Sequence, residues 1–146
     1  MAAYTGDPNF PQRIRSSSKR KQAEFLRNLY TRYSGTVFFS PSDRPLAICS
    51  VESRIRRALN VEGDYGVFND ETLLPLTLCW VRAADEHALT PIAYREGQTA
   101  LPSWSCLAYK GRIDYFRLPA QINLHSKPVL QPNSGISSLS LLERQF

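Results

Sequence analysis

The apolar residues between positions 19 and 33 recur at intervals of one, three and four, which is the spacing of an amphipathic helix. They are Phe25, Leu26, Leu29, Tyr30 and Tyr33. Ser18 stands before them as an N-cap, because its side-chain oxygen can accept a hydrogen bond from a free amide of the first turn. Ser34-Gly35 ends the pattern. The sequence therefore predicts a helix over residues 19–33 with one face to bury.

A second helix is predicted from about Pro45 to Leu59. Ser42 or Asp43 can cap its first turn, and Pro45 lies where no amide partner is required. The inward positions are Leu46, Ile48, Val51, Ile55, Ala58 and Leu59, and the outward positions are Glu52, Arg54, Arg56 and Arg57. Asn60 ends the helix.

After the second helix the pattern changes to short extended runs. Residues 65–68, 76–81 and 91–94 are predicted to be strands, because apolar residues alternate or cluster there between polar turns. The alternation in 76–81 indicates one buried face. The predicted fold class is α+β, with two N-terminal helices followed by a small, mostly antiparallel sheet and with disordered termini.

The stretch from Pro102 to Phe116 predicts a β-hairpin with an aromatic first arm. Lys110-Gly111 supplies the turn, and aromatic and branched residues flank it. Trp104 lies in the first arm, and Trp80 lies in a predicted strand earlier in the chain. We expect both indoles to be core anchors, since a tryptophan in a strand usually buries most of its surface and pairs its N–H group.

The 146 residues are enough to bury one hydrophobic core. Prolines, glycine and serines indicate that residues 1–18 form a flexible basic leader and that residues 121–146 form a Ser/Pro-rich tail. A single α+β domain is therefore expected over residues 19–120.

The net charge of +5 is concentrated near the N-terminus. Residues 1–32 carry seven Lys and Arg against two acidic residues, and the rest of the chain carries eleven of each. A basic face spanning the fold, as expected of a dedicated nucleic-acid binder, is not indicated. Lys19, Arg20 and Lys21 could still contact phosphates or serve in nuclear import. A basic-armed nucleic-acid-associated or nuclear protein is accordingly one alternative interpretation.

Reactive side chains do not form a recognisable catalytic or metal-binding pattern. Cys49, Cys79 and Cys106 are widely spaced and stand in apolar runs, where a free thiol behaves as a small buried hydrophobe. A hydrolase built from Ser105 or Cys106 with His87 would lack an orienting third group. We therefore expect no enzymatic activity, no cofactor and no metal.

Hydropathy argues against a membrane location. No segment reaches the ~20 apolar residues of a membrane span, and the N-terminus lacks the apolar core of a secretory signal. We expect an intracellular protein, cytoplasmic or nuclear.

Four short sequence motifs, at residues 29–34, 42–48, 80–82 and 102–115, occur in order along the predicted elements. They end the first helix, open the second, surround Trp80 and form the segment around Trp104. In this order, over about residues 25–118, they resemble the C-terminal half of fungal heterokaryon incompatibility (HET) domain proteins. The matching residues, for which a structural role is expected, are Tyr33, Ser34, Asp43, Arg44, Pro45, Ala47, Ile48, Trp80, Pro102, Ser103, Trp104, Ser105, Gly111, Ile113, Asp114 and Tyr115.

The resemblance implies a non-catalytic accessory or interaction module in self/nonself recognition. The implied partner is a protein, such as a HET domain supplied by another chain, because the N-terminal HET domain that names the family is expected to be absent here. A truncated gene remnant without activity is a further alternative. Cys106 replaces the family's second tryptophan, and Ser50-Val51 its usual Gly-Leu. Cys106→Trp is predicted to leave stability unchanged or to raise it.

Overall fold

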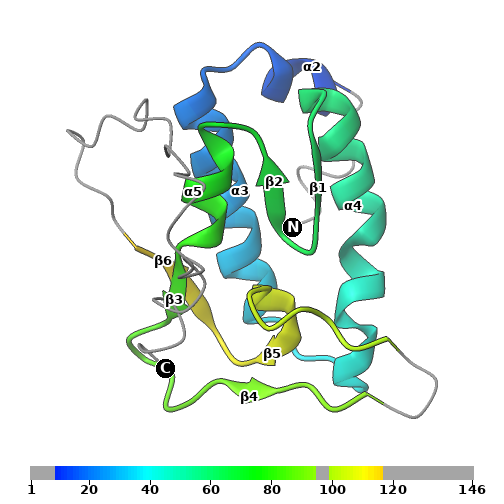
Figure 1. The fold of residues 1–146 in the computed structure, drawn as a ribbon, viewed down its shortest axis with the longest axis vertical. Coiled ribbons are helices and arrows are strands. Elements are labelled where there is room, and N and C mark those ends of the chain that lie inside the picture. Colours follow the sequence, from blue (N-terminus) through cyan, green and yellow to red (C-terminus); the bar gives the residue numbers. More distant parts are fainter. Residues whose placement is uncertain (1–8, 95–98, 117–146) are drawn as a thin grey trace, which may run out of the picture.

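The computed structural model describes residues 9–94 and 99–116, and it has the predicted α+β class (Figure 1). Its helices are α2 (Phe10–Arg15), α3 (Lys19–Ser34), α4 (Arg44–Leu59) and α5 (Leu73–Leu78). Its strands are β1 (Glu62–Asp64), β2 (Val67–Asn69), β3 (Trp80–Arg82), β4 (Thr90–Pro91), β5 (Tyr109–Lys110) and β6 (Ile113–Tyr115). The strands form antiparallel pairs β1 with β2, β3 with β6, and β4 with β5, rather than the one small sheet that was expected.

The two long helices, α3 and α4, lie where the hydrophobic pattern predicts them. The Ser18 side chain accepts from the amide of Lys21, and Gly35 follows the last turn of α3. The start of α4 differs from the prediction, because neither Ser42 nor Asp43 caps it through a side chain. A 3₁₀ turn, η1 (Pro41–Asp43), leads into α4 instead, and the amide of Arg44 donates to the Pro41 carbonyl.

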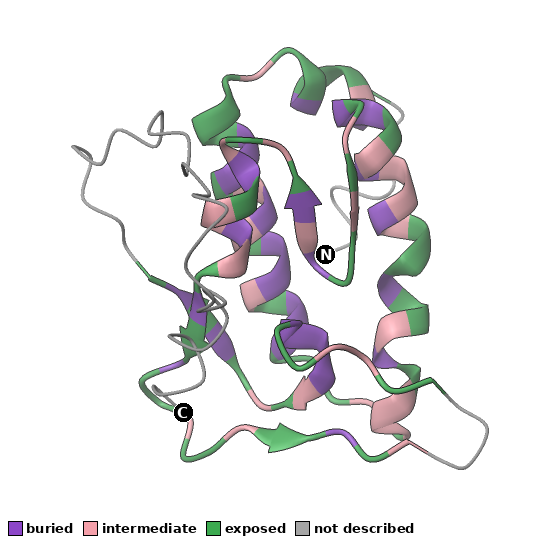
Figure 2. Cartoon of the chain, viewed as in Figure 1, coloured by how far each residue is buried: buried purple, intermediate pink, exposed green. Residues whose placement is uncertain are grey.

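The β1–β2 pair lies between α3 and α4 (Figure 1). Phe68 on β2 is buried and contacts the ring of Tyr30 on α3, with ring centroids 6.4 Å apart. Figure 2 shows buried residues concentrated along α3 and on the flank of α4 that faces this pair. Tyr65 (φ 55) and Gly66 (φ 87) form the tight turn between the strands. The strand predicted for 65–68 therefore begins only at Val67.

Residues 9–18 belong to the folded part of the chain, which corrects the prediction of a flexible leader through residue 18. Phe10 and Ile14, one turn apart on α2, are buried, and α2 packs against α4. Pro11 suits the first turn of a helix, because its missing N–H group needs no partner there. Residues 1–8 of the predicted leader lie outside the described residues.

The strand predicted for 76–81 is wrong in its first half, where the chain forms α5. Asp70 Oδ1 accepts from the amides of Thr72 and Leu73, which starts the helix. Leu73 and Thr77, four residues apart, are the buried positions of α5. Only Trp80–Arg82 is extended, as β3.

The two arms of the predicted 102–116 hairpin do not pair with each other. The first arm is a loop with a 3₁₀ turn, η2 (Cys106–Ala108), followed by β5, which pairs with β4. After Gly111 the chain turns to β6, which pairs with β3. The predicted tail, residues 121–146, lies outside the described residues.

Candidate functional site

Arg44, the first residue of α4, is a buried cation held by main-chain oxygens. It is 4% exposed, and its guanidinium Nη2 donates to the carbonyls of Ser34 (3.0 Å) and Thr36 (3.2 Å). Its Nη1 donates to the Tyr109 carbonyl at 2.9 Å. Burial lowers the pKa of the guanidinium from its ordinary value, although an arginine stays protonated at any physiological pH. Arg44 thus joins the end of α3, the start of α4 and β5.

Two neighbouring polar side chains at the end of α3 complete this junction. The Tyr33 hydroxyl donates to the main-chain carbonyl of Arg44, and burial raises the pKa of Tyr33 to about 12. Ser34 Oγ accepts from the amide of Ile113 at 3.0 Å, so it ties α3 to β6. These contacts give the helix-end and helix-start motif residues a shared structural role.

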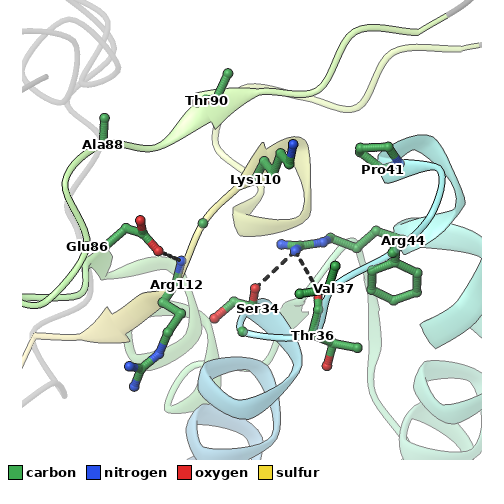
Figure 3. A pocket seen from close by; sticks show the side chains of 13 residues that line it. Ser34, Thr36, Val37, Pro41, Arg44, Glu86, Ala88, Thr90, Lys110 and Arg112 are labelled. Atoms are coloured by element: carbon green, nitrogen blue, oxygen red, sulfur yellow. Dashed lines mark hydrogen bonds between the residues drawn. The ribbon is translucent and has the colours of Figure 1, made fainter.

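A cavity of about 430 Å³ opens beside this junction, and we call it the Arg44 pocket. Its lining residues are Ser34, Gly35, Thr36, Val37, Phe38, Pro41, Arg44, Glu86, Ala88, Thr90, Lys110, Gly111 and Arg112. Figure 3 shows Arg44 on α4 at one side of it, with Lys110 on β5 and Glu86 on the connection between β3 and β4 at the other. The pocket therefore brings three motif residues, Ser34, Arg44 and Gly111, to one place.

The conformation of Gly111 shapes the rim of the pocket. Its φ is +119°, and a Cβ atom built on it would lie 2.9 Å from the Leu89 side chain and 3.2 Å from the Ala88 carbonyl. Only glycine fits this turn without strain. Gly111 is thus required for the chain to pass from β5 to β6 against residues 88 and 89.

The Pro102–Ser105 segment holds an aromatic ring at the surface. Ser105 Oγ donates to the Tyr65 carbonyl at 2.8 Å and accepts from the amide of Leu107 at 3.1 Å. Trp80 Nε1 donates to the Trp104 carbonyl at 2.8 Å. The Trp104 ring lies against Tyr65, with ring centroids 6.3 Å apart, and we call these two side chains the Trp104 surface.

The expectation of two core tryptophans is right for Trp80 and wrong for Trp104. Trp80 is 7% exposed and contacts the ring of Tyr109 at a centroid distance of 5.5 Å. Trp104 is 41% exposed. The reason is that the polar contacts around Trp104 involve its backbone, which fixes the main chain and leaves the indole facing outward.

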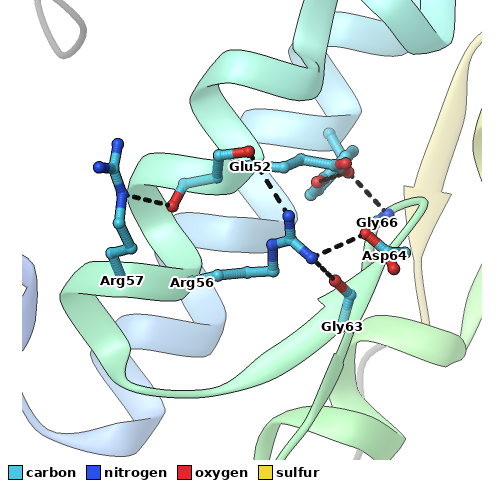
Figure 4. Close-up of polar contacts among 8 residues, drawn as sticks. Glu52, Arg56, Arg57, Gly63, Asp64 and Gly66 are labelled. Carbon is cyan, nitrogen blue, oxygen red and sulfur yellow. Dashed lines mark hydrogen bonds and ion pairs between the residues drawn. The ribbon is translucent and has the colours of Figure 1, made fainter.

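Glu52 on α4 is a buried carboxylate, whereas the hydrophobic pattern predicts it on the outside of the helix. Glu52 Oε1 accepts from the Tyr30 hydroxyl and, at 2.8 Å, from the amide of Gly66 (Figure 4). Burial raises the pKa of Glu52, and these two hydrogen bonds oppose part of that rise. The signal that could have found it is spacing, since Glu52 is four residues after Ile48 and three before Ile55, both buried.

The other motif residues divide between core and surface. Ile48, Ser105, Ile113 and Tyr115 are buried, and Pro45 and Pro102 are half-buried. Asp43, Ala47, Ser103 and Asp114 are exposed. Asp114 Oδ1 accepts from the amide of Tyr115, which is a local contact within β6.

The cysteines do not all occupy the buried positions that were expected. Cys49 and Cys79 are exposed, and only Cys106 is buried. Burial raises the pKa of Cys106 to about 12, so the thiol stays protonated and is a poor nucleophile. The hydroxyl of Ser105 donates to a backbone carbonyl, and within residues 9–94 and 99–116 no group of three His, Cys, Asp or Glu side chains could hold a metal ion.

Lys19, Arg20 and Lys21 form the exposed first turn of α3. Lys19 Nζ lies 2.7 Å from Asp70 Oδ2, so one of these three cations joins α3 to the start of α5. None of the helices in the described part of the chain has the length and apolar character needed to cross a bilayer.

Comparison with protein-family models, with curated proteins and with solved structures finds no match.

Proposed function

We propose that this chain is a non-catalytic interaction module that acts inside the cell by binding another protein through the Trp104 surface. The observation that carries the proposal is an aromatic pair held at the surface by main-chain contacts. The resemblance to the C-terminal half of HET proteins suggests the partner, a HET domain carried on another chain, and with it a role in self/nonself recognition.

The construction of the Trp104 surface supports a binding role. Two hydrogen bonds fix the backbone next to the ring, one to the Trp104 carbonyl and one from the Ser105 hydroxyl to the Tyr65 carbonyl. A rigid, amphipathic ring loses little conformational entropy on binding, and for this reason Trp and Tyr dominate interface hot spots. The ring of Trp104 can therefore serve as an anchor that needs no rearrangement of the fold.

The chemistry of the remaining side chains supports a non-catalytic role. Nucleophilic catalysis needs an activated group beside an oriented base. Ser105 Oγ instead donates to the Tyr65 carbonyl, and burial raises the pKa of the Cys106 thiol far above neutrality. His87, the base considered from the sequence, lies on the exposed connection between β3 and β4.

Co-elution with a separately expressed HET domain in size-exclusion chromatography tests the proposal. The wild-type chain is expected to co-elute, and Trp104→Ser is expected to abolish the complex. Phe39→Ser is the matched control, because Phe39 is fully exposed on the connection between α3 and α4 and its loss leaves the Trp104 surface intact. A folded wild-type chain without affinity for the HET domain, or equal loss in both variants, would refute the proposal.

A further inference from the structure

The Arg44 pocket carries more positive than negative charge. Its charged lining residues are Arg44, Lys110, Arg112 and Glu86. The guanidinium of Arg112 pairs with Asp85, and the amide of Arg112 donates to Glu86 Oε2 at 2.8 Å. Figure 3 shows the Arg112 side chain pointing away from Lys110. Arg44 and Lys110 are therefore the cations whose charge is directed to the cavity.

Arg44 Nε is a buried donor for which the described residues supply no acceptor. Nη1 and Nη2 bond to three carbonyls, whereas Nε is buried and has no hydrogen-bond partner among the described residues. A buried donor left in this state costs about 1–3 kcal/mol. Carbonyl dipoles offset part of the guanidinium charge, but no carboxylate contacts it in the described part of the chain. An oxyanion in the pocket would offset the charge that the carbonyl dipoles leave on the guanidinium.

The opposite wall offers a second cation without a partner of its own. Lys110 is exposed on β5, and in residues 9–94 and 99–116 its ammonium group makes no hydrogen bond or ion pair. Two cations that approach one cavity from different elements can hold an anionic group between them. Arg44 contributes a rigid donor, and Lys110 contributes a flexible one.

The size and the walls of the pocket define the rest of the ligand. A volume of about 430 Å³ exceeds that of a bare anion and lies within the range of about 300–1,000 Å³ typical of small-molecule sites. Val37, Pro41 and Ala88 supply apolar surface, and the Arg44 guanidinium lies 5.7 Å from the centroid of the Phe38 ring. The cavity therefore fits an apolar body attached to a charged group.

We propose that the Arg44 pocket binds a small organic anion, in which a phosphate or carboxylate group accepts from Arg44 and Lys110 while an apolar body lies against Val37 and Pro41. This site is independent of the Trp104 surface and uses none of its residues.

Phenyl phosphate and benzoate are suitable probes, because each joins an oxyanion to an apolar ring. The test is a titration of the ¹⁵N-labelled full chain, followed at the amides of Gly35 and Gly111 and at Arg44 Nε. We expect saturable shifts of these signals with at least one of the two anions, and none with benzyl alcohol, the neutral analogue.

Two single substitutions distinguish specific binding in the Arg44 pocket from nonspecific electrostatic attraction. Lys110→Gln is expected to weaken binding of the anionic probe about tenfold, the effect of losing one charge-assisted hydrogen bond. Lys21→Gln removes the same charge from an exposed position on α3 outside the pocket, and we expect it to bind the probe like the wild type. The ¹⁵N spectrum of each variant reports whether it keeps the fold.

Three outcomes would overturn the proposal. They are the absence of saturable shifts with both anions, equal weakening in the two variants, and equal binding of benzyl alcohol. Tighter binding of a capped aspartyl peptide than of either probe would assign the pocket to a protein segment instead. Loss of HET-domain binding would leave these results unchanged, so the two proposals fail separately.

Discussion

The segment 99–116 meets the helical part of the molecule in two places that are built differently. At the Trp104 surface, main-chain groups hold the backbone, and an aromatic pair remains exposed. At the Arg44 pocket, a buried side chain donates to main-chain oxygens of α3, the following loop and β5, and a cavity remains beside it. The first place presents an exposed aromatic pair, and the second presents a cavity lined by cations.

The difference indicates which kind of partner each place can take. An exposed aromatic pair contributes most when another protein covers it, because its apolar area then leaves water. A cavity lined by cations contributes most when a small anionic group enters it. Glu52 lies between the two places and holds the fold together, since it bonds to α3 through Tyr30 and to the β1–β2 turn through Gly66.

The largest expected effect on stability is that of Arg44→Ala. It removes three hydrogen bonds to a buried cation and leaves three carbonyls unpaired, so we expect a loss of about 3–5 kcal/mol in the free energy of unfolding. Urea denaturation measures it, with Arg32→Ala as a control at an exposed position of α3. A loss below about 1 kcal/mol would mean that Arg44 does not hold the junction together.

The second-largest effect is expected for Glu52→Ala, which should lower the free energy of unfolding by about 2–4 kcal/mol. The substitution leaves the Tyr30 hydroxyl and the Gly66 amide without an acceptor in the core. Glu52→Gln should cost much less, since both donors use Oε1 and an amide oxygen can replace it. The comparison by urea denaturation tests whether the hydrogen bonds or the charge of Glu52 matter to the fold.

The pH dependence of the free energy of unfolding provides a second comparison of the wild type with Glu52→Gln. Because burial raises the pKa of Glu52, the native state holds its proton more tightly than the unfolded state does. Its contribution to stability is therefore complete at low pH and falls as the pH rises through the raised pKa. The stability of the wild type relative to Glu52→Gln should decline over that interval, and a difference that grows with pH would contradict the assignment.

Cys106→Trp is next, and here the structure reverses the expectation drawn from the family pattern. Cys106 is 3% exposed, its thiol interacts with the Tyr115 hydroxyl, and a Cβ built on Gly66 would lie 3.4 Å from its Sγ atom. An indole cannot enter this space without displacing its neighbours, so we expect a loss of about 1–3 kcal/mol. Unchanged or increased stability in thermal or urea unfolding would show that the core can repack around the larger ring.

The smallest effect on stability is expected for Trp104→Ser. Trp80 donates to the carbonyl of residue 104, and that group survives the substitution. The exposed ring contributes little to the core, so the free energy of unfolding should fall by less than about 1 kcal/mol. A larger loss would show that the Trp104 side chain stabilises the core, as that of Trp80 does, and is not mainly part of a binding surface.

Much of the helical half could be predicted from the sequence, because helices depend on local patterns. The periodic apolar residues of α3, most of those of α4 and the cap at Ser18 are visible within a few turns. Leu46 is the exception, because it was expected to face inward and is 75% exposed. The residue type of Glu52 predicts an exposed side chain, and only its place on the apolar face of α4 indicates that it is buried. For α5, the run Leu73–Leu78 fits both periods, and the contacts of Asp70 with two amides decide in favour of a helix.

The β3–β6 and β4–β5 pairs could not be predicted from local patterns, because the paired strands are distant in the chain. β5 pairs with β4 and β6 pairs with β3, although the turn at Gly111 favours a hairpin within 102–116. The same limit applies to both candidate sites. The Arg44 pocket needs Lys110 brought to the start of α4, and the Trp104 surface needs Tyr65 brought to the 102–105 loop.

The indole N–H signals of the two tryptophans provide the most direct test of binding through the Trp104 surface. Because Trp80 is buried and Trp104 is exposed, one chain contains both the probe and its control. When a HET domain is added to the ¹⁵N-labelled protein, the Trp104 indole signal should shift or broaden, and that of Trp80 should change far less. A Trp104 signal that stays in place at a saturating concentration of the HET domain would contradict the proposed function.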